Sequence, residues 1–326
     1  MTQDSRGERP PKRGRGSGRA EFRAQVESTR ADIERQVQAT RAQLDATNER
    51  IEARTGRNLI LAVLIGLALG LTMLFSLIFI KELFMVFAVV IVGFTAFELA
   101  QALRHAGRVV PRIPVVIAAI AVVPAAFYWD ATGQWLALLG GILFIALWRV
   151  VLLVSRSHRG TARSVFGDIG AAFLIQVYVV FFASFAVLLV AQPGGQWWTL
   201  AFLLLVITAD TGAYASGLSF GKHPMAPTIS PKKTWEGFAG AALVCMVAGV
   251  LLSLFMLGQP WWFGLIFGSV ILLTATFGDL AESLIKRDLG IKDMSSWLPG
   301  HGGFLDRLDS ILPSAAAAYA LYLIFA

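Results

Sequence analysis

Long runs of apolar residues dominate the sequence after residue 58, and short polar segments separate them. A helix needs about 20 apolar residues to cross a bilayer, and roughly 17–25 are tolerated. The pattern therefore indicates an all-α polytopic membrane protein with a bundle of about nine transmembrane helices. The predicted spans are 59–80, 83–103, 113–129, 135–153, 168–190, 197–217, 238–258, 262–281 and 309–326.

The first 57 residues follow a different pattern. Residues 1–20 are rich in Arg, Gly and Pro, a composition that cannot bury a core and predicts a disordered basic tail. Residues 21–57 contain good helix formers, so we expect a cytoplasmic helix there, with a short coiled coil as an open alternative. The apolar residues with heptad-like spacing are Val26, Ile33, Val37, Leu44 and Ile51.

Composition excludes a soluble globular protein. The 326 residues are 56% hydrophobic and only 15% charged, whereas soluble domains average about 25% charged residues. Residues 1–58 contain 13 Lys or Arg and 9 Asp or Glu, so the charge is concentrated in this head. The single cysteine, Cys245, excludes an internal disulfide and a Cys-rich zinc site.

Basic residues between the spans predict the orientation. If the N-terminus is cytoplasmic, Lys81 is the only Lys or Arg after residue 58 that falls on the outer side. The same bias explains the net charge of +7 without nucleic acid as a partner. The predicted outer loops are too short for a catalytic site. We therefore expect the long polar loops, 218–237 and 282–308, to hold the active site at the cytoplasmic face of the cell membrane.

Two carboxylates interrupt the apolar runs. Asp210 lies within a span and Asp279 lies at the end of one, positions where a charge is costly and indicates function. On a helix that continues past Asp279, Glu282 and Lys286 share its face and are spaced for an i,i+4 ion pair. An ordinary juxtamembrane turn would explain Glu282 and Lys286, but not Asp279.

The segment Ser-Pro-Lys-Lys-Thr-Trp-Glu-Gly at 230–237 predicts an anion site. We expect Ser230 to cap a helix whose first position is Pro231. The two lysines that follow would flank the free N–H groups of this helix start. Lysines that only set the topology are the alternative. The candidate substrate-binding residues here are Ser230, Pro231, Lys232, Lys233, Thr234 and Glu236.

A glycine-rich loop precedes the last span and presents His301, for which an ordinary hydrogen-bonded loop histidine is the alternative. Asp306 and Asp309 follow at an i,i+3 spacing, and Asp279 and Asp306 could converge as metal ligands. Carboxylates with no cysteine nearby suit a hard cation such as Mg²⁺. Such a site suits phosphoryl or nucleotidyl transfer. The chain has no G-x-x-x-x-G-K-[ST] motif, which excludes a Walker-type nucleotide site.

The polar residues from 283 to 309 resemble the signature of the phosphatidate cytidylyltransferase (CDP-diacylglycerol synthase) family, S-x-x-K-R-x(4)-K-D-x-x-x-x-[LIF]-P-x-H-G-G-x-x-D-R-x-D. Segment 230–237 resembles the family's upstream motif, so the resemblance covers roughly 205–310 and does not extend to residues 1–57. The matching signature positions are Ser283, Lys286, Arg287, Lys292, Asp293, Pro299, His301, Gly302, Gly303, Asp306, Arg307 and Asp309.

This resemblance implies the reaction of CTP with phosphatidate to give CDP-diacylglycerol and diphosphate, in phospholipid biosynthesis at the bilayer surface. It also implies Mg²⁺ as cofactor, with K⁺ as a second ion, and a homodimer. Residues 58–204 would then be N-terminal transmembrane helices, and 205–326 the transmembrane catalytic region. Expected catalytic residues are Asp279, Lys286, His301, Asp306 and Arg307; expected metal ligands are Asp279, Asp306 and Asp309. Expected substrate-binding residues are Asp210, Ser230, Pro231, Lys232, Lys233, Thr234, Glu236, Ser283, Arg287, Lys292, Asp293, Gly302 and Gly303.

Other functions remain open at this point. Another CTP-dependent lipid-phosphate cytidylyltransferase, or a lipid kinase, would share the headgroup chemistry. An ion-coupled transporter using Asp210, Glu98 and Asp279 is a different class, but intramembrane charge is sparse and paired repeats of broken helices are not visible. A scaffold that acts through the N-terminal helix is the third alternative.

Overall fold

The computed structural model describes residues 35–36, 59–154, 160–298 and 302–326. The chain divides into two units, Met1–Ile60 and Leu61–Ala326. The predicted basic tail at 1–20 and nearly all of the predicted helix at 21–57 lie outside the described residues. The second unit contains every residue of the predicted catalytic region.

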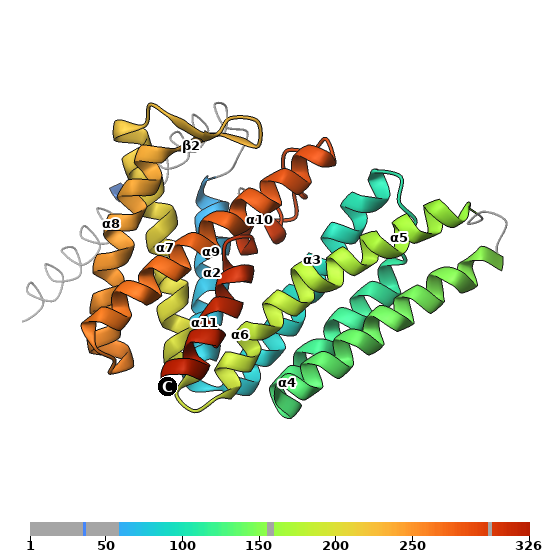
Figure 1. Ribbon diagram of the computed structural model, residues 1–326, viewed down its shortest axis with the longest axis horizontal. Helices are drawn as coiled ribbons and strands as arrows, with labels where there is room; N and C mark the ends of the chain where they lie inside the picture. Colours follow the sequence, from blue (N-terminus) through green and yellow to red (C-terminus); the bar gives the residue numbers. More distant parts are fainter. Residues whose placement is uncertain (1–34, 37–58, 155–159, 299–301) are drawn as a thin grey trace, which may run out of the picture. The chain divides into compact units, whose positions relative to one another are not determined.

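The second unit is built from helices and one short β-hairpin (Figure 1). Within the described residues, seven helices are long and apolar enough to cross a membrane, in agreement with the predicted all-α polytopic class. The elements are α2 (Leu59–Phe79), α3 (Lys81–His105), α4 (Arg112–Val151), η1 (Leu152–Val154), α5 (Ala162–Ile175), the π-helical η3 (Gln176–Phe181), α6 (Phe182–Ala191), α7 (Gly195–Phe220), β1 (Pro224–Ala226), β2 (Ser230–Thr234), α8 (Trp235–Leu252), the π-helical η4 (Ser253–Leu257), α9 (Trp261–Asp288), α10 (Leu305–Leu308) and α11 (Ile311–Phe325).

Helix α4 is two helical arms joined by a sharp bend. Trp129 and Asp130 have non-helical dihedral angles, and Asp130 has a φ of 53°. The arms correspond to the spans predicted at 113–129 and 135–153. The polar connection predicted between those spans is therefore shorter than expected, because the second arm resumes immediately after the bend.

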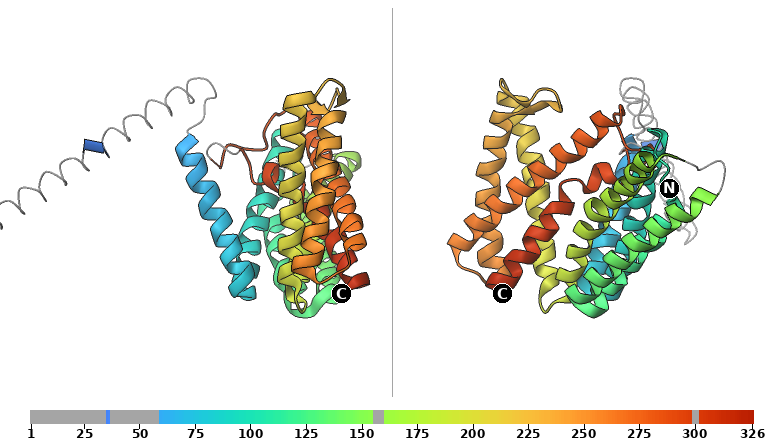
Figure 2. Two further views of the ribbon diagram at one scale, coloured as in Figure 1. Left: turned by 90° about the vertical axis from the view of Figure 1, so that its left-hand side faces the viewer. Right: turned by 45° about the vertical axis from the view of Figure 1, so that its right-hand side comes forward.

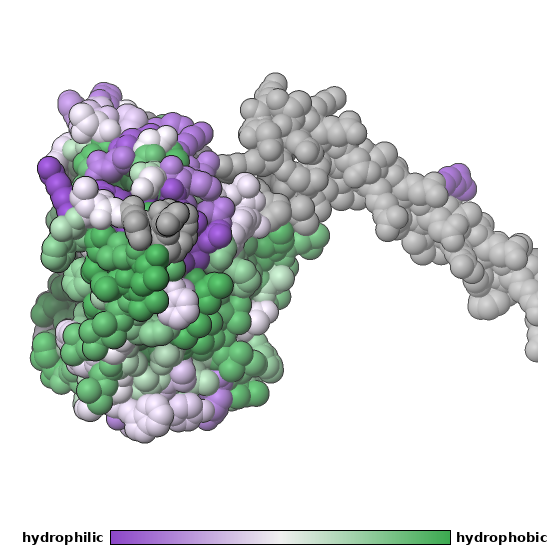
Figure 3. Space-filling model, turned by 90° about the vertical axis from the view of Figure 1, so that its right-hand side faces the viewer, coloured by the Kyte–Doolittle hydropathy of each residue, from purple (hydrophilic) through white to green (hydrophobic). Residues whose placement is uncertain are grey.

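Helix α11 packs against α6, α7 and α9. Helix α8 packs against both α7 and α9 (Figures 1 and 2). Leu99, Phe202 and Phe267 are among the fully buried residues of this core. Large apolar side chains are also exposed, and Figure 3 shows them as a broad band between two more polar ends. Such a band suits a lipid environment, which is as apolar as the core.

Helices α8 and α9 approach each other through glycines. A Cβ placed at Gly268 would lie 2.5 Å from the carbonyl oxygen of Cys245, and one at Gly264 would lie 2.5 Å from that of Gly249. Gly264 and Gly268 form a G-x-x-x-G pair on α9. Small residues at this spacing allow helix backbones to come close in membranes.

Replacing Gly268 by Val is therefore expected to lower the free energy of unfolding by about 1–3 kcal/mol, the usual cost of overpacking. The measurement is thermal unfolding of the purified protein in detergent. Gly140→Val is the matched control, because a Cβ at Gly140 meets no atom within 4 Å. An equal melting temperature for the two variants would contradict a backbone contact between α8 and α9.

The β-hairpin replaces the helix start predicted at Ser230. Ser230 pairs with Ala226 and Thr234 with Pro224 in an antiparallel ladder, so residues 230–234 are a strand. Helix α8 begins at Trp235, and the Thr234 hydroxyl caps it by accepting a 3.1 Å hydrogen bond from the Gly237 amide. The prediction of a Ser230 cap and Pro231 at the first helical position is wrong. Pairing with the neighbouring strand β1 overrode the helix-start signal.

A buried ion pair joins the end of α4 to α5. The Arg149 guanidinium donates to Asp168 Oδ2 from Nε at 3.0 Å and from Nη2 at 2.8 Å, and both side chains are buried. Asp168 Oδ1 also accepts from the Val109 amide at 2.9 Å, just beyond α3. A charge is tolerated in such a place only when paired, so this contact fixes the ends of three helices.

Candidate active site

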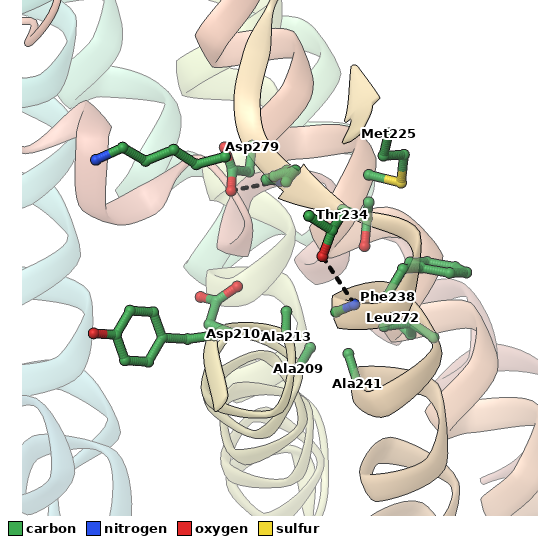
Figure 4. A pocket seen from close by; sticks show the side chains of 14 residues that line it. Ala209, Asp210, Ala213, Met225, Thr234, Phe238, Ala241, Leu272 and Asp279 are labelled. Atoms are coloured by element: carbon green, nitrogen blue, oxygen red, sulfur yellow. Dashed lines mark hydrogen bonds and ion pairs between the residues drawn. The ribbon is translucent and has the colours of Figure 1, made fainter. Parts of the chain in front are cut away.

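A pocket of about 290 Å³ lies between α7, β2, α8 and α9 (Figure 4). Apolar side chains such as Ala209, Phe238 and Leu272 form one side of it. Polar residues from the predicted anion site at 230–237 and the two carboxylates that interrupt the apolar runs form the other side. These are Asp210, Lys232, Lys233, Thr234 and Asp279.

Lys233 and Asp279 join the hairpin to α9 inside this pocket. Lys233 Nζ lies 2.6 Å from Asp279 Oδ2, and the two side chains are 24% and 30% exposed. Ser283 Oγ donates to the other carboxylate oxygen of Asp279 at 3.3 Å. The predicted anion site and the end of the α9 span therefore meet, and an ammonium and a carboxylate lie together where a ligand can reach them.

Lys286 connects α9 to α10. Its ammonium pairs with Glu282, as the i,i+4 spacing predicted, and with Asp306 Oδ1 at 2.9 Å. The Glu282 carboxylate is fully buried. One lysine thus pairs with carboxylates on two elements, Glu282 on α9 and Asp306 on α10.

The carboxylate of Asp306 also holds the polypeptide that leads into α10. Its Oδ2 accepts hydrogen bonds from the Met294 amide at 3.0 Å and from the Gly303 amide at 2.8 Å. Gly302 directly precedes Gly303, and its φ of +83° lies in the left-handed region that favours glycine.

Two predicted substrate-binding residues hold the hairpin in place. Arg287 Nε donates to the Ile229 carbonyl oxygen at 3.2 Å. Glu236 accepts from the Lys222 and His223 amides at 3.1 and 3.2 Å and pairs with the His223 ring at 2.5 Å. Direct substrate contact by Arg287 and Glu236 stays a prediction.

Other predicted residues lie away from the pocket lining. Ser230 and Pro231 lie on β2, and Pro231 is exposed; Lys292 and Asp293 are exposed in the segment after α9. Arg307 is exposed on α10 and interacts electrostatically with Asp210. Pro299 and His301 lie outside the described residues.

Comparison with known proteins decides the family. A model described as "Cytidylyltransferase family" matches residues 60–325. The chain belongs to the cytidylyltransferase family. It is 41% identical to the phosphatidate cytidylyltransferase of Mycobacterium bovis over 273 residues, covering 82% of this chain and 89% of the relative. The phosphatidate cytidylyltransferase of Mycobacterium leprae is 36% identical over 276 residues (82% and 88%), and that of Staphylococcus epidermidis is 34% identical over 201 residues (61% and 75%).

The predicted metal site of this family member has suitable donors in part. Asp309 interacts electrostatically with both Asp279 and Asp210, and carboxylates are the donors that a hard cation prefers. In the part of the chain that is described, however, no three His, Cys, Asp or Glu residues are arranged to hold a metal ion. Both oxygens of Asp306 already accept hydrogen bonds from protein groups. The metal ligands stay a prediction.

Glu98 was not among the predicted site residues of the enzyme. This residue of α3 accepts hydrogen bonds from Ser295 and from the backbone at the start of α10. The available signal was its position as a lone carboxylate in the apolar run 83–103. A charged group is energetically costly there and therefore indicates a function. The Arg149–Asp168 ion pair was not predicted either, because its two residues belong to separate predicted spans.

Proposed function

We propose that the protein transfers the cytidylyl group of CTP to phosphatidate, giving CDP-diacylglycerol and diphosphate, as a step of phospholipid biosynthesis. The observation that carries this proposal is the pocket in which Lys233 and Asp279 meet, next to Asp210. The relatives named phosphatidate cytidylyltransferase support the choice of nucleotide and lipid.

In this proposal a phosphate oxygen of phosphatidate attacks the α-phosphorus of CTP. A new P–O bond forms, and the bond to the diphosphate leaving group breaks. The attacking oxygen is already an anion at neutral pH, so the site needs no strong general base. Catalysis then consists of positioning and charge neutralisation, for which the pocket offers Lys232 and Lys233.

We also propose Mg²⁺ as the cofactor, with K⁺ as a second ion. Bound Mg²⁺ supplies charge neutralisation on the transferring phosphate. Asp279 and Asp309 would hold it near Asp210, and Asp306 could join them only if its oxygens were released by Lys286 and the backbone amides. The phosphate-binding part of the reaction rests on the protein's own lysines.

The orientation is part of the same proposal. The hairpin and the start of α10 would face the cytoplasm, because the long polar loops contain the basic residues that the positive-inside rule assigns there. Each arm of the bent α4 would cross the bilayer and so would the shorter α2, which gives nine spans together with the other six long apolar helices. The homodimer that the family resemblance implies can be tested by the mass of the protein in detergent.

Transfer of radiolabel from [α-³²P]CTP into chloroform-extractable lipid tests the reaction, using purified protein, phosphatidate and Mg²⁺. We expect label in the lipid, and a fall of roughly 100-fold with Lys233→Gln, because an ammonium aimed at the phosphates is lost. Lys222→Gln is the matched control, since Lys222 is exposed and does not line the pocket.

The other functions give different results in the same assay. Label that passes to lipid only from [γ-³²P]CTP would make the protein a lipid kinase. Transfer to other lipid phosphates but not to phosphatidate would change the acceptor. Ion flux across vesicles without any CTP turnover would replace the enzyme by a transporter.

A further inference from the structure

Glu98 places a carboxylate inside the bundle, far in sequence from the predicted catalytic region. It lies on α3 and is 1% exposed. A buried carboxylate is costly unless strong donors surround it. Among the described residues, no Lys or Arg side chain forms an ion pair with Glu98, so its environment must stabilise the charge by other means.

The donors come from the segment that connects α9 to α10. Glu98 Oε2 accepts from the Leu305 amide at 2.8 Å, and Oε1 accepts from the Phe304 amide at 3.2 Å and from the Ser295 hydroxyl. Hydrogen bonds to a carboxylate are roughly twice as strong as neutral ones. Three such hydrogen bonds to one buried carboxylate attach Ser295 and the backbone at Phe304 and Leu305 to α3.

The backbone of Gly303 packs closely against the same carboxylate. A Cβ built at Gly303 would overlap the carboxylate oxygens of Glu98, so any larger residue must displace one of the two partners. Phe304 adds an apolar contact, since its ring stacks on Phe94 of α3 at a centroid distance of 5.3 Å.

The fixed backbone leads directly to the charged network. Leu305, which Glu98 holds, is followed by Asp306, whose side chain pairs with Lys286 at 2.9 Å. Asp306 also accepts from the Gly303 amide, next to Phe304. By accepting from the Leu305 amide, Glu98 therefore fixes the backbone from which the Asp306 and Arg307 side chains extend.

We propose that Glu98 is a positioning residue for the cytidylyl transfer: its carboxylate fixes the start of α10 on α3 and thereby places Asp306 and Arg307. This inference rests on the proposed function for its kinetic test, but its structural test needs no substrate. Glu98 does not line the pocket in which Lys233 and Asp279 meet, so its role in this proposal is positioning and not catalysis.

The test compares Glu98→Gln with Glu82→Gln. Glu82 is an exposed residue in the first turn of the same helix, so it controls for the loss of one charge from α3. Glutamine keeps the size of Glu98 but turns an NH₂ group toward N–H and O–H donors. We expect kcat for cytidylyl transfer to fall about 10–100-fold, the usual effect of losing a group that orients site residues.

Hydrogen exchange measured by mass spectrometry gives the structural readout. We expect the amides of Phe304 and Leu305 to exchange roughly tenfold faster in Glu98→Gln, because charge-assisted hydrogen bonds are lost, while α7 and α8 are unchanged. Ser295→Ala, which removes only the side-chain donor, gives a milder second variant if Glu98→Gln does not fold.

A double-variant cycle separates positioning from a general loss of structure. Gly303→Ala alone is expected to lower kcat, because its methyl group collides with the Glu98 carboxylate. In Glu98→Ala the space is vacant, so Glu98→Ala/Gly303→Ala should be no slower than Glu98→Ala. Additive losses would overturn the proposal, since neighbours that compete for one space cannot act independently.

The two proposals can fail separately. Normal transfer and normal exchange in Glu98→Gln, indistinguishable from Glu82→Gln, would overturn the positioning role while leaving the function intact. If the wild type transfers no cytidylyl group, the proposed function fails, and faster exchange at Phe304 and Leu305 would still support the attachment of α10 by Glu98.

Discussion

Replacing Lys286 by Met is expected to lower the free energy of unfolding by about 3–5 kcal/mol, as found when a buried ion pair loses one partner. The Glu282 carboxylate is fully buried and pairs with Lys286, so the substitution leaves it without its cation. Asp306 loses the same partner. We also expect cytidylyl transfer to fall below about 1% of the wild-type rate, because the network that places Asp306 is broken. Thermal unfolding in detergent and the lipid-labelling assay measure the two effects.

Two further variants define this result. Lys222→Met removes an exposed lysine and should leave the melting temperature unchanged. Glu282→Gln/Lys286→Met removes the unpaired charge together with its partner, so it should recover much of the stability but not the transfer. A Lys286→Met protein as stable as Lys222→Met would show that the buried carboxylate does not depend on this lysine.

Replacing Asp279 by Asn should separate activity from stability. The Lys233–Asp279 pair is partly exposed, and such pairs contribute about 1 kcal/mol or less, so the melting temperature should hardly change. We expect kcat to fall at least about 100-fold, because the pocket loses the carboxylate that orients Lys233 and that the metal proposal needs. The concentration of Mg²⁺ that gives half-maximal rate should also rise.

Asp288→Asn is the control for this variant, because Asp288 is an exposed carboxylate at the end of the same helix. It should retain the wild-type rate and Mg²⁺ dependence. If Asp279→Asn also retained both, Asp279 could be neither a metal ligand nor an essential part of the pocket.

Local patterns carried much of the prediction. Lipid solvates apolar residues over the length of a helix, so the long apolar helices could be predicted from hydropathy alone, and the two arms of α4 overlap two of the predicted spans. The Glu282–Lys286 pair was predictable because its spacing lies within one helix, where geometry follows from sequence separation.

Contacts between separate elements were not predictable in the same way. Ser230 with Pro231 has the local signal of a helix start, but pairing with β1 made this segment a strand and left capping to Thr234. Lys233 and Asp279 were each recognised as candidates, yet nothing in their spacing indicated that they pair. Glu98 and Leu305 are 207 residues apart, and a single sequence contains no record of such a contact.

That separation has a consequence for the order in which the protein is made. At a synthesis rate of about 5–20 residues per second, the 207 residues between Glu98 and Leu305 take roughly 10–40 s to follow. During this interval α3 already contains the Glu98 carboxylate, but the chain does not yet contain the amides that donate hydrogen bonds to it. The early helices must therefore pass through a stage with an incompletely solvated acid, and a ribosome that stops before residue 304 leaves Glu98 without either backbone partner.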